Sequence, residues 1–256
     1  MDFEIIDFHT HPFTDASNNI CAHKDFCDMS TENILKEFKK LGVSKICGSV
    51  GTGRGTGWQR LKESNDNAIM LRDYFDGFYI PGFKVSTAYM EESINEIHRM
   101  HKAGVKIMGE LCPYLHDWDD YSSDEFSLLL DEAAKYNMIV SFHSQGEDEM
   151  DAMVRKHKDI IFVAAHPGEY NEFMRHIERM KMSENYYLDL SGYGMFRYGM
   201  LRRLIDVVGI DRILFGSDYP TCNPGMYIGG VLLDNLITDS EKEKIFSLNA
   251  KKLLKI

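Results

Sequence analysis

Two histidines separated by a single residue, His9 and His11, follow a short apolar run at residues 4–8. In an extended strand, side chains two positions apart lie on the same side, so both imidazoles can be directed at one point. Imidazole nitrogens are common ligands of divalent metal ions. The alternative is that the two histidines only form hydrogen bonds at the end of a strand, and the pair alone does not decide between these interpretations.

Further residues of metal-ligand type occur at the ends of other apolar runs. His143, His166 and Asp218 each follow such a run, and Glu110 lies within another. In a closed barrel of parallel strands the carboxyl ends of all strands meet at one face, so residues that are distant in sequence converge there. Four of the ten histidines in the chain, counting the first two, fall at such positions. This joint placement favours a metal site over a set of structural histidines.

The order of elements predicts the barrel itself, because short runs rich in β-branched and aromatic residues alternate with longer segments of helical period. The predicted strands are residues 4–8, 45–50, 77–84, 105–111, 138–142, 160–165, 186–190 and 212–215. The predicted helices start at residue 30 or 31 and end at 41, and then cover residues 64–74, 91–103, 124–136, 147–157, 170–182, 198–208 and 240–254. Without a linker between these units, the sequence predicts an α/β fold, a single (β/α)8 TIM barrel over residues 1–256.

Composition limits the partners of the chain. A formal net charge of -11 argues against nucleic-acid binding, which relies on clustered Lys and Arg. No apolar run is long enough to cross a bilayer, and the first residues lack the pattern of a signal peptide. The five cysteines are odd in number and scattered, which is typical of reduced thiols. We therefore expect a cytoplasmic protein that acts on a small-molecule substrate and has no membrane partner.

The ligand types narrow the choice of metal. Imidazole combined with carboxylate oxygen suits zinc, our first choice, and also manganese, iron or cobalt. Asp218 lies in a Gly-Ser-Asp-Tyr-Pro segment that also suits a turn, but its position after the eighth predicted strand favours a ligand. Glu110 has three interpretations: it bridges a second metal ion, it pairs with Lys106 or Lys84, or it binds substrate.

These residues resemble the amidohydrolase superfamily over nearly the whole chain, and in particular its amidohydrolase-2 branch, which includes aminocarboxymuconate semialdehyde decarboxylase-like enzymes. The similar segments are residues 6–12, 188–192, 214–220 and 247–254, together with the histidines after strands five and six. The resemblance implies one metal ion held by His9, His11, His143 and Asp218, with His166 beside it as a catalytic residue.

The Gly109-Glu110 pair departs from this pattern. It is more similar to the TatD-type hydrolases, in which the corresponding glutamate bridges two metal ions. In that group the histidine at the position of His166 is a metal ligand. The resemblance therefore allows either one ion or two.

A bound divalent cation lowers the pKa of a coordinated water to about 7, which predicts a hydrolase acting on an amide, ester, lactone or phosphoester bond. We expect Asp218 to take the proton of this water and to pass it to the leaving group, while His166 or the metal stabilises the oxyanion. The candidate contacts to a polar or anionic substrate are Arg54, Lys84 and Arg197. Arg54 lies in the glycine-rich segment 51–57, which also suits a surface loop.

Three other functions are consistent with the same residues. Non-hydrolytic decarboxylation uses the same scaffold, because a fold does not determine the reaction. TatD-like nuclease activity is a second alternative, against which the acidic charge argues. The third is a barrel that binds a metal or ligand without catalysis, and the complete ligand set argues against it.

Overall fold

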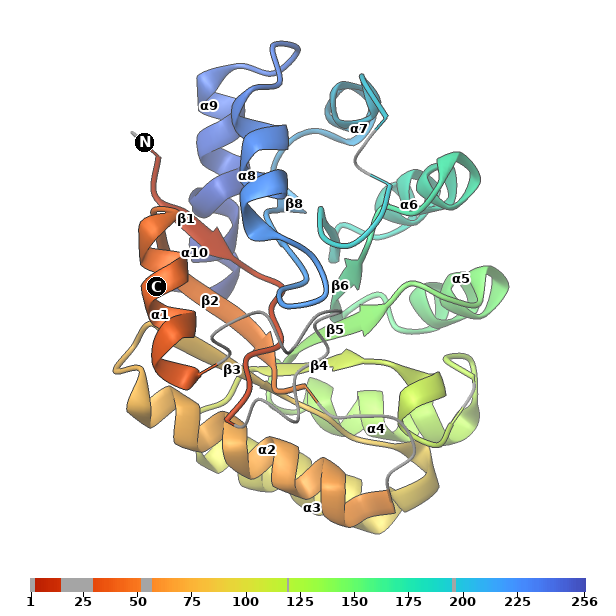
Figure 1. Cartoon of the computed structure of the whole chain (residues 1–256). Coiled ribbons are helices and arrows are strands. Elements are labelled where there is room, and N and C mark those ends of the chain that lie inside the picture. The colour runs from red at the N-terminus through yellow and green to blue at the C-terminus, as the bar shows by residue number, and fades with distance from the viewer. Residues whose placement is uncertain (1–2, 15–29, 52–56, 119, 195–196) are drawn as a thin grey trace.

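The strands form one parallel sheet that curves into a barrel at the centre of the molecule (Figure 1). The computed structural model of the chain describes residues 3–14, 30–51, 57–118, 120–194 and 197–256. In their hydrogen-bonded order, the strands are β1 Ile5–Asp7, β2 Val43–Ser49, β3 Tyr79–Phe83, β4 Ile107–Leu111, β5 Ile139–His143, β6 Ile161–Ala165, β7 Tyr186–Asp189 and β8 Ile213–Leu214. Each predicted strand is present, and the (β/α)8 prediction is confirmed.

Backbone hydrogen bonds beyond the last strand close the sheet. The Phe8 N–H donates to the Phe215 carbonyl at 2.8 Å, and the Asp218 N–H donates to the His9 carbonyl at 2.8 Å. The segments that carry His9 and Asp218 are therefore held side by side, although they lie near opposite ends of the sequence.

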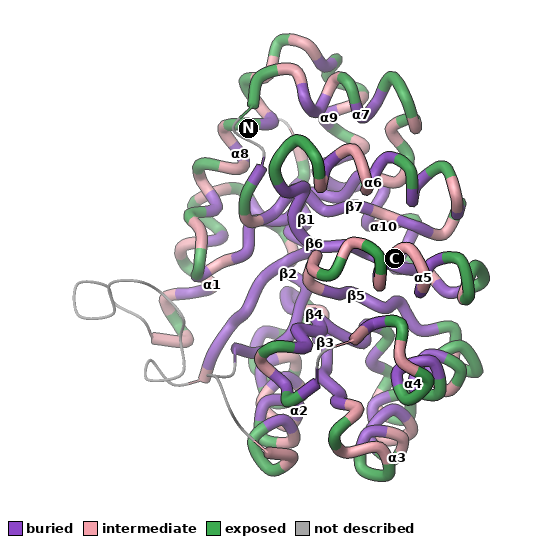
Figure 2. Tube along the Cα trace, turned by 90° about the vertical axis from the view of Figure 1, so that its right-hand side faces the viewer, coloured by how far each residue is buried: buried purple, intermediate pink, exposed green. Residues whose placement is uncertain are grey.

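Helices surround the sheet, and their outer faces are exposed while most strand residues are buried (Figure 2). They are α1 Thr31–Lys40, α2 Gly57–Tyr74, α3 Met90–Lys102, α4 Asp124–Ala134, α5 Glu147–Lys156, α6 Tyr170–Met182, α7 Met200–Val208, α8 Pro224–Leu232, α9 Asp239–Glu243 and α10 Asn249–Leu254. Short turns η3 Thr87–Tyr89 and η4 Pro113–Leu115 follow β3 and β4, and a π-helical turn, η5 Lys244–Leu248, joins α9 to α10. None of the described helices is long and apolar enough to span a membrane.

Helix α2 begins at Gly57, earlier than the predicted residue 64. Its buried face includes the polar residues Ser64 and Asn65. The Ser64 hydroxyl donates to the Val50 carbonyl, and the Asn65 amide bonds to the backbone of Lys84. These hydrogen bonds allow polar side chains to lie on the buried face of the helix. The sequence of α2 therefore lacks the regular apolar pattern expected of an amphipathic helix.

Helix α8 was not predicted, because its proline and three glycines weaken the helical pattern. The Asn223 side chain accepts the Gly225 N–H, and Pro224 occupies the first turn, where a missing N–H costs nothing. Ile228 and Val231 are buried. Capping and packing therefore stabilise this helix in spite of its composition.

The amino-terminal end of the barrel is closed by apolar packing. Inward-facing residues of the strands form a cluster with α10; it comprises Ile6, Phe8, Cys47, Ile107, Ile139, Val163, Leu214, Ala250, Leu253 and Leu254. A larger apolar cluster lies between the strands and the outer helices. The opposite end of the barrel, at the carboxyl termini of the strands, is where active sites lie in barrels of this type.

Candidate active site

The carboxyl ends of the strands surround a cavity of about 390 Å³. Its described lining consists of His11, Gly51, Lys84, Glu110, Cys112, Tyr114, Leu115, His116, His143, His166, Gly192, Tyr193, Asp218, Thr221 and Cys222. Five of the six predicted metal ligands are in this lining, and the sixth, His9, is buried beside them. The structure thus brings together all six residues that the sequence pattern singled out.

The first group of ligand atoms comes from the segments after β1 and β8. His9 Nε2 and His11 Nε2 lie 3.1 Å apart. Asp218 Oδ1 lies 3.8 Å from the first of these nitrogens and 3.5 Å from the second. Three ligand atoms within 4.8 Å of one another can hold one metal ion.

The second group comes from β4, β5 and the segment after β6, and Glu110 joins it to the first. Glu110 Oε2 lies 3.4 Å from His9 Nε2 and 3.2 Å from His11 Nε2. Its other oxygen, Oε1, lies 3.0 Å from His143 Nδ1 and 3.6 Å from His166 Nε2. The two oxygens of one carboxylate therefore face two different groups, each of which can hold a metal ion.

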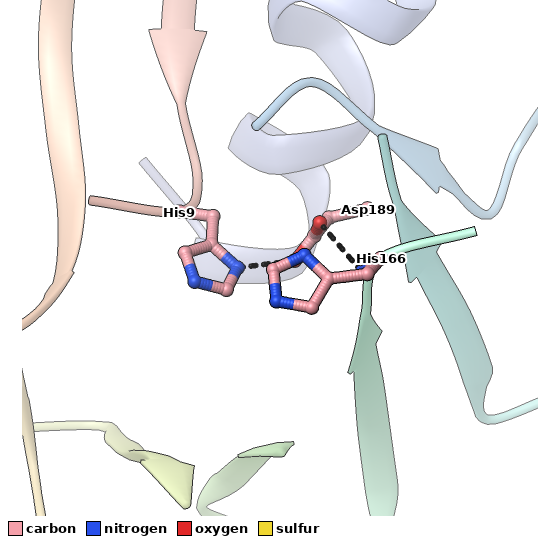
Figure 3. Close-up of side chains that lie close together, drawn as sticks. All are labelled: His9, His166 and Asp189. Atoms are coloured by element: carbon pink, nitrogen blue, oxygen red, sulfur yellow. Dashed lines mark hydrogen bonds and ion pairs between the residues drawn. The ribbon is translucent and has the colours of Figure 1, made fainter. Parts of the chain in front are cut away.

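Hydrogen bonds on the far side of the imidazoles fix their orientation. His9 Nδ1 lies 2.9 Å from Asp189 Oδ2, and His11 Nδ1 donates to the Ser49 carbonyl at 3.0 Å. When Nδ1 carries the hydrogen, Nε2 presents its lone pair to the cavity. Such outer contacts are typical of metal-binding histidines. Figure 3 shows Asp189 between the His9 ring and the backbone of His166.

Asp189 and Ser191 are the site residues that the sequence analysis did not assign. Asp189 ends β7, and the Ser191 hydroxyl lies 3.0 Å from His166 Nδ1 and 3.1 Å from His9 Nδ1. The available signal was positional, because an aspartate at the end of a buried strand faces the same end of the barrel as the predicted ligands. Both residues lie behind the histidines and hold them in place.

The electrostatics of the site favour a cation. Burial alone would lower the pKa of His9, but the carboxylates of Asp189 and Glu110 outweigh it and raise that pKa well above its usual value. Burial alone would raise the pKa of Glu110, but the charge of His9 and hydrogen bonds from His11 and His143 hold it well below its usual value. A positive charge at this position, as a proton or as a metal ion, therefore has anionic partners already in place.

Two of the ligand-type residues have backbone conformations that side chains rarely adopt. His166 has φ 69° and Asp218 has φ 62°. Gly192 packs against the ring of His166, since a Cβ there would lie 2.1 Å from His166 Nδ1. Strained backbone held by its surroundings is common at functional sites.

The three predicted substrate contacts differ in position. Lys84 lies in the cavity lining, where its ammonium donates to the Val50 carbonyl at 2.7 Å and burial lowers its pKa to about 8. Arg197 is half exposed and pairs with Glu169, and it is not among the described lining residues. Arg54 lies outside the residues that the structure describes.

A (β/α)8 barrel whose strand ends gather imidazole and carboxylate ligand atoms has the architecture of a metal-dependent enzyme. The amidohydrolase-2 family model, described as amidohydrolase, matches residues 6–256, and the chain belongs to this family. No curated protein matches the sequence.

Solved structures with the same fold include several decarboxylases. A 2,6-dihydroxybenzoate decarboxylase in complex with 2,6-dihydroxybenzoate has a TM-score of 0.77 at 14% identity, covering 99% of this chain and 100% of its own. A 5-carboxyvanillate decarboxylase from Sphingomonas paucimobilis has a TM-score of 0.74 at 13% identity and covers 100% of both chains. A dihydroxybenzoic acid decarboxylase from Polaromonas sp. JS666, with bound manganese, has a TM-score of 0.73 at 13% identity, covering 99% and 97%. At these identities the similarity shows the fold.

Proposed function

We propose that this member of the amidohydrolase family is a divalent-metal-dependent hydrolase in which two groups of ligand residues, joined by Glu110, would each hold one ion. The placement of the two Glu110 oxygens carries the proposal, because each faces a separate group of ligand atoms. His9, His11, Asp218 and Glu110 would hold the first ion, and Glu110, His143 and His166 would hold the second. In this arrangement His166 would be a ligand.

The donor set fits zinc, which remains our first choice, and it also fits manganese. When bound, a divalent cation supplies Lewis acidity and lowers the pKa of a coordinated water to about 7. The Nε2 atoms of His9 and His11 are held toward the cavity by bonds at their other nitrogens, so these two ligands need little rearrangement.

We propose that Asp218 moves a proton. Its Oδ1 faces the nitrogens of His9 and His11, whereas its Oδ2 lies on the side of Cys222, which lines the cavity. We propose that Oδ2 accepts the proton of the attacking water and returns it to the leaving group. One carboxylate thereby serves as ligand and as general base.

The substrate we propose is a small polar or anionic molecule. The cavity has the size of a small-molecule site. Lys84 in its lining supplies a cationic group, and five of the proposed metal ligands line the same cavity. We propose that Lys84 binds the anionic part of the substrate, whereas the position of Arg197 against Glu169 gives its proposed contact less support.

Decarboxylation is the second candidate, and the comparisons favour it over hydrolysis because several similar structures are decarboxylases. On this alternative, one ion is held by His9, His11, His143 and Asp218, with His166 beside it as the catalytic residue. The orientation of Glu110 toward both groups of ligands is the observation that favours hydrolysis.

The two reactions are distinguished by their products. Metal-loaded protein is incubated in ¹⁸O-labelled water with two panels: esters, lactones, amides and phosphoesters, and aliphatic and aromatic carboxylic acids. Hydrolysis places one ¹⁸O atom in the product without releasing carbon dioxide. Release of carbon dioxide without ¹⁸O in the other product would establish decarboxylation and reject the hydrolase proposal.

A further inference from the structure

A second cavity, of about 320 Å³, lies beside the first. Its described lining consists of Leu190, Gly192, Tyr193, Gly194, Phe215, Met226, Tyr227, Gly230 and Val231. No acidic or basic side chain occurs among these described residues, in contrast to the lining of the first cavity. The second cavity is therefore suited to an apolar group.

The two cavities share a wall. Gly192 and Tyr193 line both of them. On another side, the side chains of Cys222 of the first cavity and Tyr227 of the second are close enough to affect each other's pKa. Only a narrow partition thus separates the apolar space from the ligand cluster.

The partition stands next to the proposed metal ligands. The Tyr193 ring lies 6.1 Å from the His166 ring and is 51% exposed. The direct route from the ligand cluster to the second cavity therefore runs past the Tyr193 side chain.

Helix α8 forms the outer side of the second cavity and exposes apolar surface there. Met226 is 73% exposed although it lines the cavity, whereas Leu190 and Phe215 at its base are buried. An apolar group placed between these residues would remove its own apolar surface and that of Met226 from water, which stabilises binding.

We infer that the second cavity binds an alkyl or aromatic portion of the substrate whose anionic group reacts at the metal cluster. This inference rests on the proposed function and narrows its substrate class to acids or their derivatives that carry an apolar arm. The charged cavity then selects the reacting group, and the apolar cavity selects the arm.

Two neighbouring glycines of α8 provide a matched pair of variants. A Cβ at Gly230 or at Gly229 would meet no described heavy atom within 4 Å, so either position accepts a side chain. Gly230 lines the second cavity, whereas Gly229 is not among its described lining residues. Replacing a helical glycine also favours the helix, so neither substitution is expected to unfold the protein. Gly230→Leu fills the cavity, and Gly229→Leu is the control.

The experiment measures the affinity of metal-loaded protein for acetate, butanoate, hexanoate and 5-phenylpentanoate by calorimetry. We expect affinity to rise about fourfold for each methylene that enters the apolar cavity. In Gly230→Leu, affinity for 5-phenylpentanoate falls at least tenfold while affinity for acetate stays within twofold. In Gly229→Leu, affinity still rises with the length of the acid as in the unchanged protein.

The inference would be overturned if affinity did not rise with chain length in the unchanged protein, or if it rose equally in Gly230→Leu. The proposed function fails differently. If the long acids bind in a Gly230-dependent manner while two-ion loading or hydrolysis is absent, the apolar site stands and the hydrolase proposal is rejected. If hydrolysis is found but affinity does not rise with chain length, the hydrolase proposal stands and the apolar site is rejected.

Discussion

The two ends of the barrel are built from opposite kinds of buried residue. At the amino-terminal end, Ile107, Ile139 and Val163 pack against Leu253 of α10. At the carboxyl-terminal end, ionisable side chains are buried among one another, and Glu110 is only 5% exposed. Apolar burial stabilises a fold directly, whereas buried charges need partners to offset their loss of hydration. Stability and chemistry therefore reside at separate ends of the barrel, so mutations at the two ends should have different effects.

The largest effect is expected at the open end. Asp218→Asn removes the proposed general base, and we expect kcat to fall about a thousandfold at saturating metal. The free energy of unfolding of the metal-free protein should not fall, because the variant removes a buried charge. Full activity with metal still bound would contradict the role of Asp218.

At the closed end, a mutation should lower stability and leave metal binding unchanged. Ile139→Ala deletes a buried branched side chain and is expected to lower the free energy of unfolding by about 3 kcal/mol, measured by urea denaturation. Ile139→Val, the control, should cost about 1 kcal/mol. Metal content per folded chain should be unchanged in both, and a loss of metal with unchanged stability would contradict the separation of the two ends.

A smaller effect is expected on the pH dependence of stability, from a buried histidine outside the site. The four predicted ligand histidines of the open end face carboxylates, whereas His176 in α6 bonds to the Tyr186 hydroxyl and is fully buried. Burial, with the charge of Arg179, lowers the pKa of His176 to about 3. Between pH 6.5 and that value, the unfolded chain binds a proton at this residue and the folded chain does not. The stability it contributes is therefore present above pH 6.5 and is lost as pH falls.

Each pH unit below 6.5 lowers the free energy of unfolding by about 1.4 kcal/mol through this residue. His176 should therefore account for about 2 kcal/mol of the loss of stability between pH 7.5 and pH 5. In His176→Gln, which cannot ionise, the loss over this range should be smaller by that amount. Urea denaturation of the metal-free proteins at both pH values measures it. An identical loss in the variant would show that His176 does not set the acid sensitivity.

Much of the fold and the convergence of the ligand-type residues could be predicted from sequence, because both depend on period and position. Parallel strands bring their carboxyl ends to one face, which is why residues as distant as His11 and Asp218 were expected together. What was missed depends on tertiary contacts. The polar buried face of α2 is satisfied by strand ends, and α8 is stabilised by the packing of Ile228 in spite of its glycines. The role of Asp189 behind His9 required the side-chain geometry.

The number of bound ions tests the central claim most directly. Freshly purified and reloaded protein is analysed for metal content beside Glu110→Gln and a control, Glu96→Gln, which alters a buried glutamate that contacts Asn65 and Arg99 away from the site. We predict two ions per chain in the unchanged protein and in the control, and at most one in Glu110→Gln. One ion in the unchanged protein that persists in Glu110→Gln would contradict the bridge, and no ion after reloading would contradict the metal site itself.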